Sequence, residues 1–503
     1  MKRIISLIMV LFLVLSFGVT THAEEKDTIV AGVSGEPKTL NCVLSSDRNT
    51  EQVTTSIYDT LTDMDDVDDE IKPGLAESWE LNDKKDQVVF KIREGVKFHN
   101  GDILTPEDVA FSYNLCIKKG STKLLTGMMD RMEVTGKNEV TLYLKHTFEP
   151  ILRILATPRL GIINKKAYEA DPDGFARNPV GTGPFKFVSW ESGDRVTLER
   201  FDDYYKGPAA YKHLIIRIMV DLNTAAIALE NGEIDIMPGL QASDIVNLEK
   251  NKDLAVYEKT SANFHMIILN NNEGLFADKE ARLAVAYAIN RQEIIDGVLE
   301  GKADPLYVFM AHGVFGYPKD FEPMEYDIEK AREHLAKSSY KGEELLFKTT
   351  QSAERVKVSE LICAQLADAG FNIKVDQMEG GRFFDEVYAH MKYEIGLFNT
   401  TSDYGDADAP GFARLHSSMF GNSNNYFGVK NEELDKVLEE GRFSADPEVR
   451  EKAYEKMSEI IRDEAITVPL FAGLNNVVAN KNIKGVKANS VLKIYYGKLS
   501  WGE

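Results

Sequence analysis

The chain has 503 residues, which is enough for two to four domains with a substantial hydrophobic core. A hydrophobic content of 43%, with 10% aromatic residues, excludes a disordered or fibrous protein. The 80 acidic residues outnumber the 59 basic ones and give a net charge of −21, which argues against a nucleic-acid partner because phosphate binding needs concentrated Lys and Arg.

The first 23 residues have the pattern of a secretory signal. Lys2 and Arg3 precede a long apolar run, and Thr21 and Ala23 supply the small residues that precede a cut after Ala23. A retained membrane anchor is the alternative, although the run is shorter than the roughly 20 residues that cross a bilayer. The residue directly after the cut is not a cysteine, so no lipid attachment at the mature amino terminus is expected. No later apolar run could span a bilayer, so we expect an exported, periplasmic protein.

The segment 75–98 is predicted to form a β-hairpin, because residues 87–93 alternate between apolar and polar side chains and 82–86 form a polar turn. A helix is predicted to follow from Pro106, since Thr105 is a suitable N-cap residue and proline suits the first helical position.

His99 stands between this hairpin and this helix, near three acids that could complete a metal or acid/base site: Asp102, Glu107 and Asp108. However, Asn100 and Gly101 are turn residues, and the two later acids suit the positive end of the helix dipole. A catalytic histidine also needs a nucleophile or a metal co-ligand that this stretch does not provide. We therefore predict that His99 is scaffolding.

A second capped helix is predicted to begin at Asp446 and Pro447. Four apolar residues of this helix share one face: Ala453, Met457, Ile460 and Ile461. This spacing indicates a stripe packed in the core and not a cofactor site.

Three cysteines, Cys42, Cys116 and Cys363, are too few and too far apart for a disulfide framework or a zinc site, so buried thiols are predicted. The chain has no nucleophile elbow, phosphate loop or HExxH motif. The acidic run 63–70 lacks the glycine of a calcium loop. The sequence therefore predicts no catalytic set, no cofactor and no metal site.

Six segments, in this order, carry a resemblance: "IKPGLAESWE", "VVFKIREGVKFHNGDILTPEDVAFSYN", "NPVGTGPFKFVSWESGDRVTLERFDDYYKGP", "ALENGEIDI", "ARLAVAYAINRQEII" and "YDIEKAREHL". Together they resemble the extracytoplasmic solute-binding proteins, family 5, of ABC importers for peptides and nickel. The resemblance implies an α/β fold of the periplasmic-binding-protein type (type II, cluster C), with two lobes, a hinge and an extra α/β domain.

The resemblance also implies the division of the chain: a signal in 1–23, lobe I in 24–55, 180–268 and 472–503, the extra domain in 56–179 packed on lobe I, and lobe II in 269–471. Lobes built from separate stretches explain why no linker is visible in the sequence. A protein of this family binds a solute between its lobes, closes over it and presents it to a membrane permease with its ATPase. A monomer that captures di- or oligopeptides, and that is not an enzyme, is the implied function.

The peptide binders of this family pair the ligand's α-ammonium with an aspartate early in a loop after a strand. In "YEIGLFNTTSDYGDADAPGF" the matching residue is Asp403, with Tyr404 and Asp406 beside it as further candidate ligand contacts. A carboxylate suits a desolvated ammonium because a charge-assisted hydrogen bond offsets its lost hydration. An Asx turn in an acidic loop, which also contains Asp408, is the alternative for Asp403.

Two departures from the family pattern bear on specificity. The family's usual Gly-Trp before the acidic loop is replaced by Asn399 and Thr400, so the first side-chain pocket is predicted to be wider and more polar. The arginine that clamps a dipeptide carboxylate is absent from Thr349, Thr350, Gln351 and Ser352. A dipeptide-specific clamp is therefore not expected.

Two alternative functions stay open at this point. The Pro158-Arg159 pair resembles the place where nickel-chelate binders hold carboxylates, so a nickel chelate or another small anionic solute is one alternative, with His416 as a possible metal ligand. A structural ion pair is the other interpretation of Arg159. A secreted hydrolase on the same fold is the remaining alternative, which the missing catalytic set disfavours.

Overall fold

The computed structural model describes residues 26–45, 47–64, 70–120, 123–420 and 424–502. The predicted secretory signal and most of the acidic run 63–70 lie outside the described residues. None of the helices in the described ranges is long and apolar enough to span a membrane.

One mixed sheet of eleven strands runs through the molecule. Its order is β15 (Ile373–Met378), β14 (Leu345–Thr350), β16 (Ile395–Thr401), β12 (Leu254–Leu269), β17 (Thr467–Asn480), β11 (Ile236–Pro238), β1 (Thr28–Val33), β10 (His213–Ile218), β9 (Arg195–Arg200) and β8 (Phe185–Glu191), with β13 (Ala303–Pro305) paired to β17. The strands from lobe I and from lobe II therefore meet at the central pair, β12 and β17.

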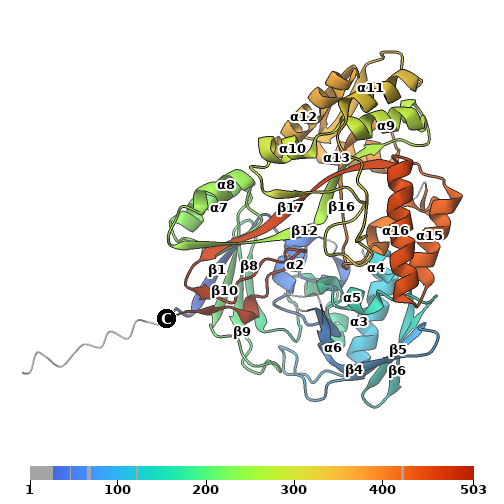
Figure 1. The fold of residues 1–503 in the computed structure, drawn as a ribbon. Coiled ribbons are helices and arrows are strands. Elements are labelled where there is room, and N and C mark those ends of the chain that lie inside the picture. The colour runs from blue at the N-terminus through green and yellow to red at the C-terminus, as the bar shows by residue number, and fades with distance from the viewer. Residues whose placement is uncertain (1–25, 46, 65–69, 121–122, 421–423, 503) are drawn as a thin grey trace, which may run out of the picture.

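These two long strands pair antiparallel from Leu254–Asn480 to Ile268–Thr467, with register shifts at 260–264 and 265–266. Figure 1 shows them crossing the middle of the molecule, with α9 to α12 on one side and β1 and β8 to β10 on the other. The boundaries expected between the lobes, 268/269 and 471/472, fall inside these strands. Paired strands, and not loops, connect the two parts; the division into domains stays a prediction.

A second sheet of four antiparallel strands lies within 56–179, in the order β4 (Ala76–Leu81), β5 (Gln87–Ile92), β7 (Glu139–Leu144) and β6 (Met129–Gly136). Two small strand pairs complete the described strands: β2 (Thr62–Met64) with β3 (Ile71–Pro73), and β18 (Ile483–Lys484) with β19 (Ser500–Trp501). The predicted hairpin over 75–98 is confirmed as β4 and β5.

Helices cover the sheets on both sides. The residues predicted as lobe I contain α2 (Arg48–Thr54), α7 (Leu222–Glu230) and α8 (Ala242–Leu248). Those predicted as the extra domain contain α3 (Pro106–Lys119), α4 (Lys123–Thr126), α5 (Ile151–Leu155) and α6 (Lys165–Ala170). The residues predicted as lobe II contain α9 (Lys279–Ala288), α10 (Arg291–Val298), α11 (Ile328–Lys337), α12 (Ala353–Ala369), α13 (Gly380–Phe383), α14 (Asp408–Leu415), α15 (Glu432–Phe443) and α16 (Pro447–Asp463).

Both predicted capped helices are confirmed. Thr105 and Asp108 form a reciprocal capping box at the start of α3, in which each side chain accepts from the other residue's backbone N–H. Asp446 caps α16, and the predicted apolar stripe of this helix is buried.

The buried side chains form several clusters. One cluster is shared by lobe I and the extra domain, another lies under α7 and α8, and two lie mainly in lobe II and extend onto β12 and β17. Tyr404 and Ala409 come from lobe II but pack into the cluster of lobe I and the extra domain. The two lobes are therefore in contact in this structure.

His99 is part of the scaffold, as predicted. Its Nε2 donates to the carbonyl oxygen of Gly183 at 2.9 Å, and its ring meets Phe201 edge to face. The nearby Asp108 belongs to the capping box of α3, where its carboxylate accepts from the backbone N–H of Thr105. The same carboxylate accepts from the backbone N–H of Lys165. No nucleophile approaches this ring among its described contacts.

The stability of the fold should depend on pH through His99. Burial lowers the pKa of His99 from 6.5 to about 4. Between these values the unfolded chain binds a proton that the folded protein does not, so the free energy of unfolding falls as the pH falls from about 6.5 to about 4, by at most about 3 kcal/mol. Urea unfolding at pH 7 and pH 4.5 should show a smaller loss for His99→Gln than for the unchanged protein. An equal loss in both proteins would contradict this assignment.

All three cysteines are buried and form no disulfide in the described part of the chain, which confirms the predicted buried thiols. The thiol of Cys42 faces the carbonyl oxygen of Gly161 at 3.7 Å. Burial raises the pKa of Cys363 to about 12, so this thiol stays protonated and unreactive at neutral pH.

Candidate functional site

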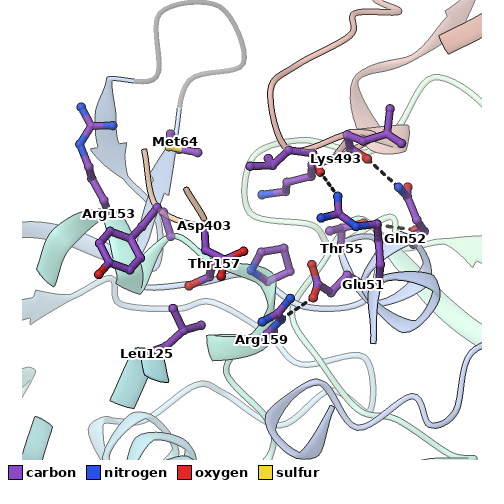
Figure 2. A pocket seen from close by; sticks show the side chains of 16 residues that line it. Glu51, Gln52, Thr55, Met64, Leu125, Arg153, Thr157, Arg159, Asp403 and Lys493 are labelled. Carbon is purple, nitrogen blue, oxygen red and sulfur yellow. Dashed lines mark hydrogen bonds and ion pairs between the residues drawn. The ribbon is translucent and has the colours of Figure 1, made fainter. Parts of the chain in front are cut away.

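A cavity of about 720 Å³, counted with its solvent-open part, lies between lobe I, the extra domain and lobe II (Figure 2). Its lining comes from α2, from the segment 153–159, from the loop 491–493 and from two residues of lobe II, Asp403 and Tyr404. Segments that are far apart in the sequence therefore form one site, as a ligand held between two lobes requires.

Asp403 lies in a tight turn directly after β16. Ser402 accepts from the backbone N–H of Gly405 at 3.0 Å, and Gly405 has φ +66°, a conformation that favours glycine. The turn places the half-buried carboxylate of Asp403 in the cavity wall. Within the described ranges, this carboxylate makes no hydrogen bond or ion pair, so an Asx turn does not use it.

Tyr404 also lines the cavity, but its hydroxyl group is occupied. It donates to Asp408 Oδ2 at 2.7 Å, and the ring packs edge to face on Phe148 of the extra domain. Asp408 also lies 3.3 Å from Arg442. Tyr404 thus offers the cavity an aromatic surface and joins lobe II to the extra domain.

Asp406 does not line the cavity. Both of its carboxylate oxygens accept from Nη2 of Arg450 at 2.8 Å, and both side chains are nearly inaccessible to solvent. The same guanidinium reaches Glu149 of the extra domain at 3.2 Å. Burial alone would lower the pKa of Arg450, but Asp406 outweighs it and holds that pKa above its usual value. The structure thus gives Asp406 a structural partner in place of a ligand.

Asn399 and Thr400 lie on β16, outside the lining of this cavity. Asn399 Oδ1 accepts from Arg355 at 2.9 Å, and its amide group donates to Asn263. Arg355 also donates to the carbonyl oxygen of Leu397 at 2.5 Å. This arginine stands in the first turn of α12, just beyond the segment 349–352, and its two terminal nitrogens bond to β16 while its Nε is buried without a partner among the described residues.

Arg159 does line the cavity, in a short 3-10 helix spanning Pro158–Leu160. Its Nε forms an ion pair with Glu51 of α2, and each side chain is about one-fifth exposed. The ion-pair interpretation of Arg159 is therefore the one that the geometry supports, and Glu51 balances its charge.

His416 lies at the end of α14, away from the cavity lining. Its ring stacks on Phe412, and its Nδ1 lies 2.7 Å from the hydroxyl group of Ser418. Its Nε2 is 3.5 Å from Glu439 and 3.9 Å from Asp435. Among the described residues, no group of three or more His, Cys, Asp or Glu side chains is placed to hold a metal ion.

Sequence reasoning missed several charged residues of this region: Arg48, Arg153 and Lys493 in the cavity lining and Arg450 behind the loop. A signal existed for Arg450, because it occupies the same face of α16 as the apolar stripe and a charge on a buried face needs a buried partner. The cavity residues had no such local signal.

Comparison with known proteins agrees with this architecture. The family model described as "Bacterial extracellular solute-binding proteins, family 5 Middle" matches residues 70–422. The oligopeptide-binding protein AppA of Bacillus subtilis is 27% identical, over 94% of this chain and 91% of AppA.

Two solved structures extend the comparison. The periplasmic binding protein DppA from Helicobacter pylori, in complex with the peptide STSA, has a TM-score of 0.83 and 26% identity and covers 97% of this chain and 100% of its own. Bacillus subtilis AppA in complex with a nonapeptide has a TM-score of 0.80 and 25% identity and covers 95% and 99%. The chain belongs to the bacterial extracellular solute-binding proteins, family 5.

Proposed function

We propose that this protein is the substrate-capturing component of an ABC importer, which binds peptides between its lobes and delivers them to a membrane permease. The observation that carries this proposal is the carboxylate of Asp403, which lies without a partner among the described residues in the wall of the cavity between the lobes. A half-buried carboxylate of this kind favours a cationic group, and a peptide supplies one at its amino terminus.

The lining of the cavity supports the same ligand class. The aromatic ring of Tyr404 and the apolar side chains of Met64, Leu125 and Leu492 stand beside the charged groups. Such a mixture accepts varied side chains while charges fix the ligand's ends. The related proteins whose names or complexes specify a peptide ligand make peptides the first class to test.

Contacts between the lobes support capture by closure. Arg450 reaches Glu149 across the boundary, and the ammonium group of Lys85 donates to the carbonyl oxygen of Ala445 at 2.8 Å. A ligand that touches both sides of the cavity stabilises the closed form relative to an open one. Export to the periplasm, a monomeric state and the absence of enzymatic activity are parts of the same proposal.

A thermal-shift experiment tests the proposal. Tri- to pentapeptides should raise the melting temperature of the ligand-stripped protein, because a ligand at a hundred times its dissociation constant stabilises the folded state by about 2.7 kcal/mol. The same peptides with an acetylated amino terminus should give a much smaller shift. Mass spectrometry of the recovered peptide should show no cleavage. Equal shifts with free and acetylated peptides would remove the ammonium contact from the proposal, and no shift with any peptide would overturn it.

A further inference from the structure

A second cavity adjoins the first at Lys493. The second cavity, about 1010 Å³ with its solvent-open part, shares Thr55, Pro158 and Lys493 with the first. Its remaining lining comes from lobe I and the start of the extra domain. Lys493 therefore stands on the wall that both spaces have in common.

The first cavity is lined by four basic side chains, Arg48, Arg153, Arg159 and Lys493, and by two acidic ones, Glu51 and Asp403. The whole chain, in contrast, has a net charge of −21. An excess of basic residues in the cavity of so acidic a protein favours a ligand that carries at least one negatively charged group.

Most of the basic groups near Lys493 have partners within the protein. Arg159 pairs with Glu51, Arg48 donates to the carbonyl oxygen of Val491 at 2.7 Å, and Lys206 lies 3.1 Å from Asp63. The ammonium group of Lys493 differs from them. In the described part of the chain it makes no hydrogen bond or ion pair, and it contacts the ring of Tyr495 at 4.2 Å from the centroid.

The loop that carries Lys493 is held in place from several sides. The side chain of Asn489 accepts from the backbone N–H of Lys493 at 2.9 Å and donates to its carbonyl oxygen at 2.6 Å. Arg48 and Gln52 of α2 donate to the carbonyl oxygens of the two preceding residues (Figure 2). Leu492 has φ +56°, a left-handed conformation that costs a non-glycine residue about 1 kcal/mol or more. A strained loop fixed by four hydrogen bonds is typical of a functional position.

We propose that Lys493 binds an anionic group of the captured peptide, so that the cavity selects peptides that carry an acidic group besides the ammonium held by Asp403. The anionic group is the terminal carboxylate or an Asp or Glu side chain of the ligand. This inference rests on the proposed function, since it names the class of peptide that the site takes.

The position of Lys493 gives the physical reason for this preference. Burial lowers the pKa of the Lys493 ammonium, and the attraction of Asp63, Asp59 and Glu51 opposes this shift without overcoming it. None of these three acids makes a direct ion pair with Lys493, and a ligand carboxylate supplies that direct contact. Asp403 comes from lobe II and Lys493 from lobe I, so a peptide with opposite charges at the two places bridges the lobes.

Peptide pairs that differ in one charge test the inference. The set consists of tetrapeptides with one Glu at the second, third or fourth position. Each has a neutral twin in which Gln replaces that Glu. Every peptide is made once with a free and once with an amidated carboxyl terminus, and the amidated form is the neutral twin for the terminal carboxylate. Calorimetry should show that at least one acidic member binds about tenfold more tightly than its neutral twin. The pair of peptides that differs in affinity identifies the acidic group that Lys493 binds, either the terminal carboxylate or a Glu side chain at one position.

Variants connect the preference to Lys493. Lys493→Gln should abolish the tenfold preference while still binding the neutral twin, and Lys493→Arg should retain it. Lys137→Gln, in the exposed turn between β6 and β7, removes the same charge outside both cavities and should behave like the unchanged protein.

These experiments distinguish a failure of the inference about Lys493 from a failure of the proposed peptide capture. If peptides bind but every charged and neutral twin binds equally, or if Lys493→Gln keeps the preference, the inference is wrong and peptide capture stands. If no peptide binds, the proposed function fails and the inference fails with it. If Lys493→Gln does not fold, the inference is tested by comparing acidic and neutral twins on the unchanged protein and on Lys493→Arg. Equal binding of the twins by both proteins would show that the inference is wrong.

Discussion

Replacing Asp403 by asparagine is expected to weaken the binding of a peptide with a free amino terminus by about 30-fold, which corresponds to about 2 kcal/mol. The substitution keeps the size of the side chain and removes the charge that the ligand ammonium needs. Because Asp403 makes no hydrogen bond or ion pair with other described residues, the fold itself should lose little stability. Isothermal titration calorimetry with Asp403→Asn and the unchanged protein measures the difference.

Two controls separate the ammonium contact from a general loss of charge. Asp368→Asn, at an exposed position of α12, removes one negative charge away from the cavity and should leave the affinity unchanged. An amino-terminally acetylated peptide should bind Asp403→Asn and the unchanged protein equally. Unaltered affinity of Asp403→Asn for the free peptide would remove Asp403 from the site.

The second large effect is expected at Asp406, and it concerns stability. Asp406→Asn leaves the buried guanidinium of Arg450 with Glu149 as its remaining carboxylate partner, and the loss of one partner from a buried ion pair costs about 3 kcal/mol or more. Urea unfolding should therefore show a free energy of unfolding lower by that amount. The fraction that remains folded should still bind peptide with nearly unchanged affinity.

Glu149→Gln is the matched control for this prediction. Glu149 is 38% exposed, and an exposed ion pair contributes less than about 1 kcal/mol. A loss of stability in Asp406→Asn no larger than that of Glu149→Gln would show that the buried pair does not support the fold. A selective loss of peptide affinity with unchanged stability would return Asp406 to the ligand site.

Local signals in the sequence identified elements that local interactions specify. The β4–β5 hairpin, the capping box of α3 and the start of α16 depend on residues within a few positions of one another. The order of the main sheet depends instead on pairings between distant strands, such as β12 with β17. No short window of sequence encodes such a pairing, so only the family resemblance implied that connection.

The candidate site also combines features that the sequence indicated with features that depend on distant contacts. The resemblance identified Asp403, which the structure places in the cavity, and Asp406, which it places in a buried ion pair. The two residues lie three positions apart on one acidic loop, and sequence alone did not distinguish their surroundings. Lys493 reaches the cavity from a loop 90 positions beyond Asp403 (403 to 493). Its role depends on Asn489 and α2, which become its neighbours only in the folded chain.

The first strand, β1, is joined to a residue near the other end of the sequence by one side-chain hydrogen bond. The indole of Trp501 donates to the carbonyl oxygen of Thr28 at 3.0 Å across a sequence separation of 473 positions, while β11 pairs with β17. Contacts between residues so far apart in the sequence form slowly, because the chain must first lose the entropy of closing the long loop between them. The predicted lobe II, in contrast, is one continuous stretch, 269–471. Asp403 comes from this continuous stretch and Lys493 from a loop near the end of the sequence, so the cavity exists only once these distant segments have met.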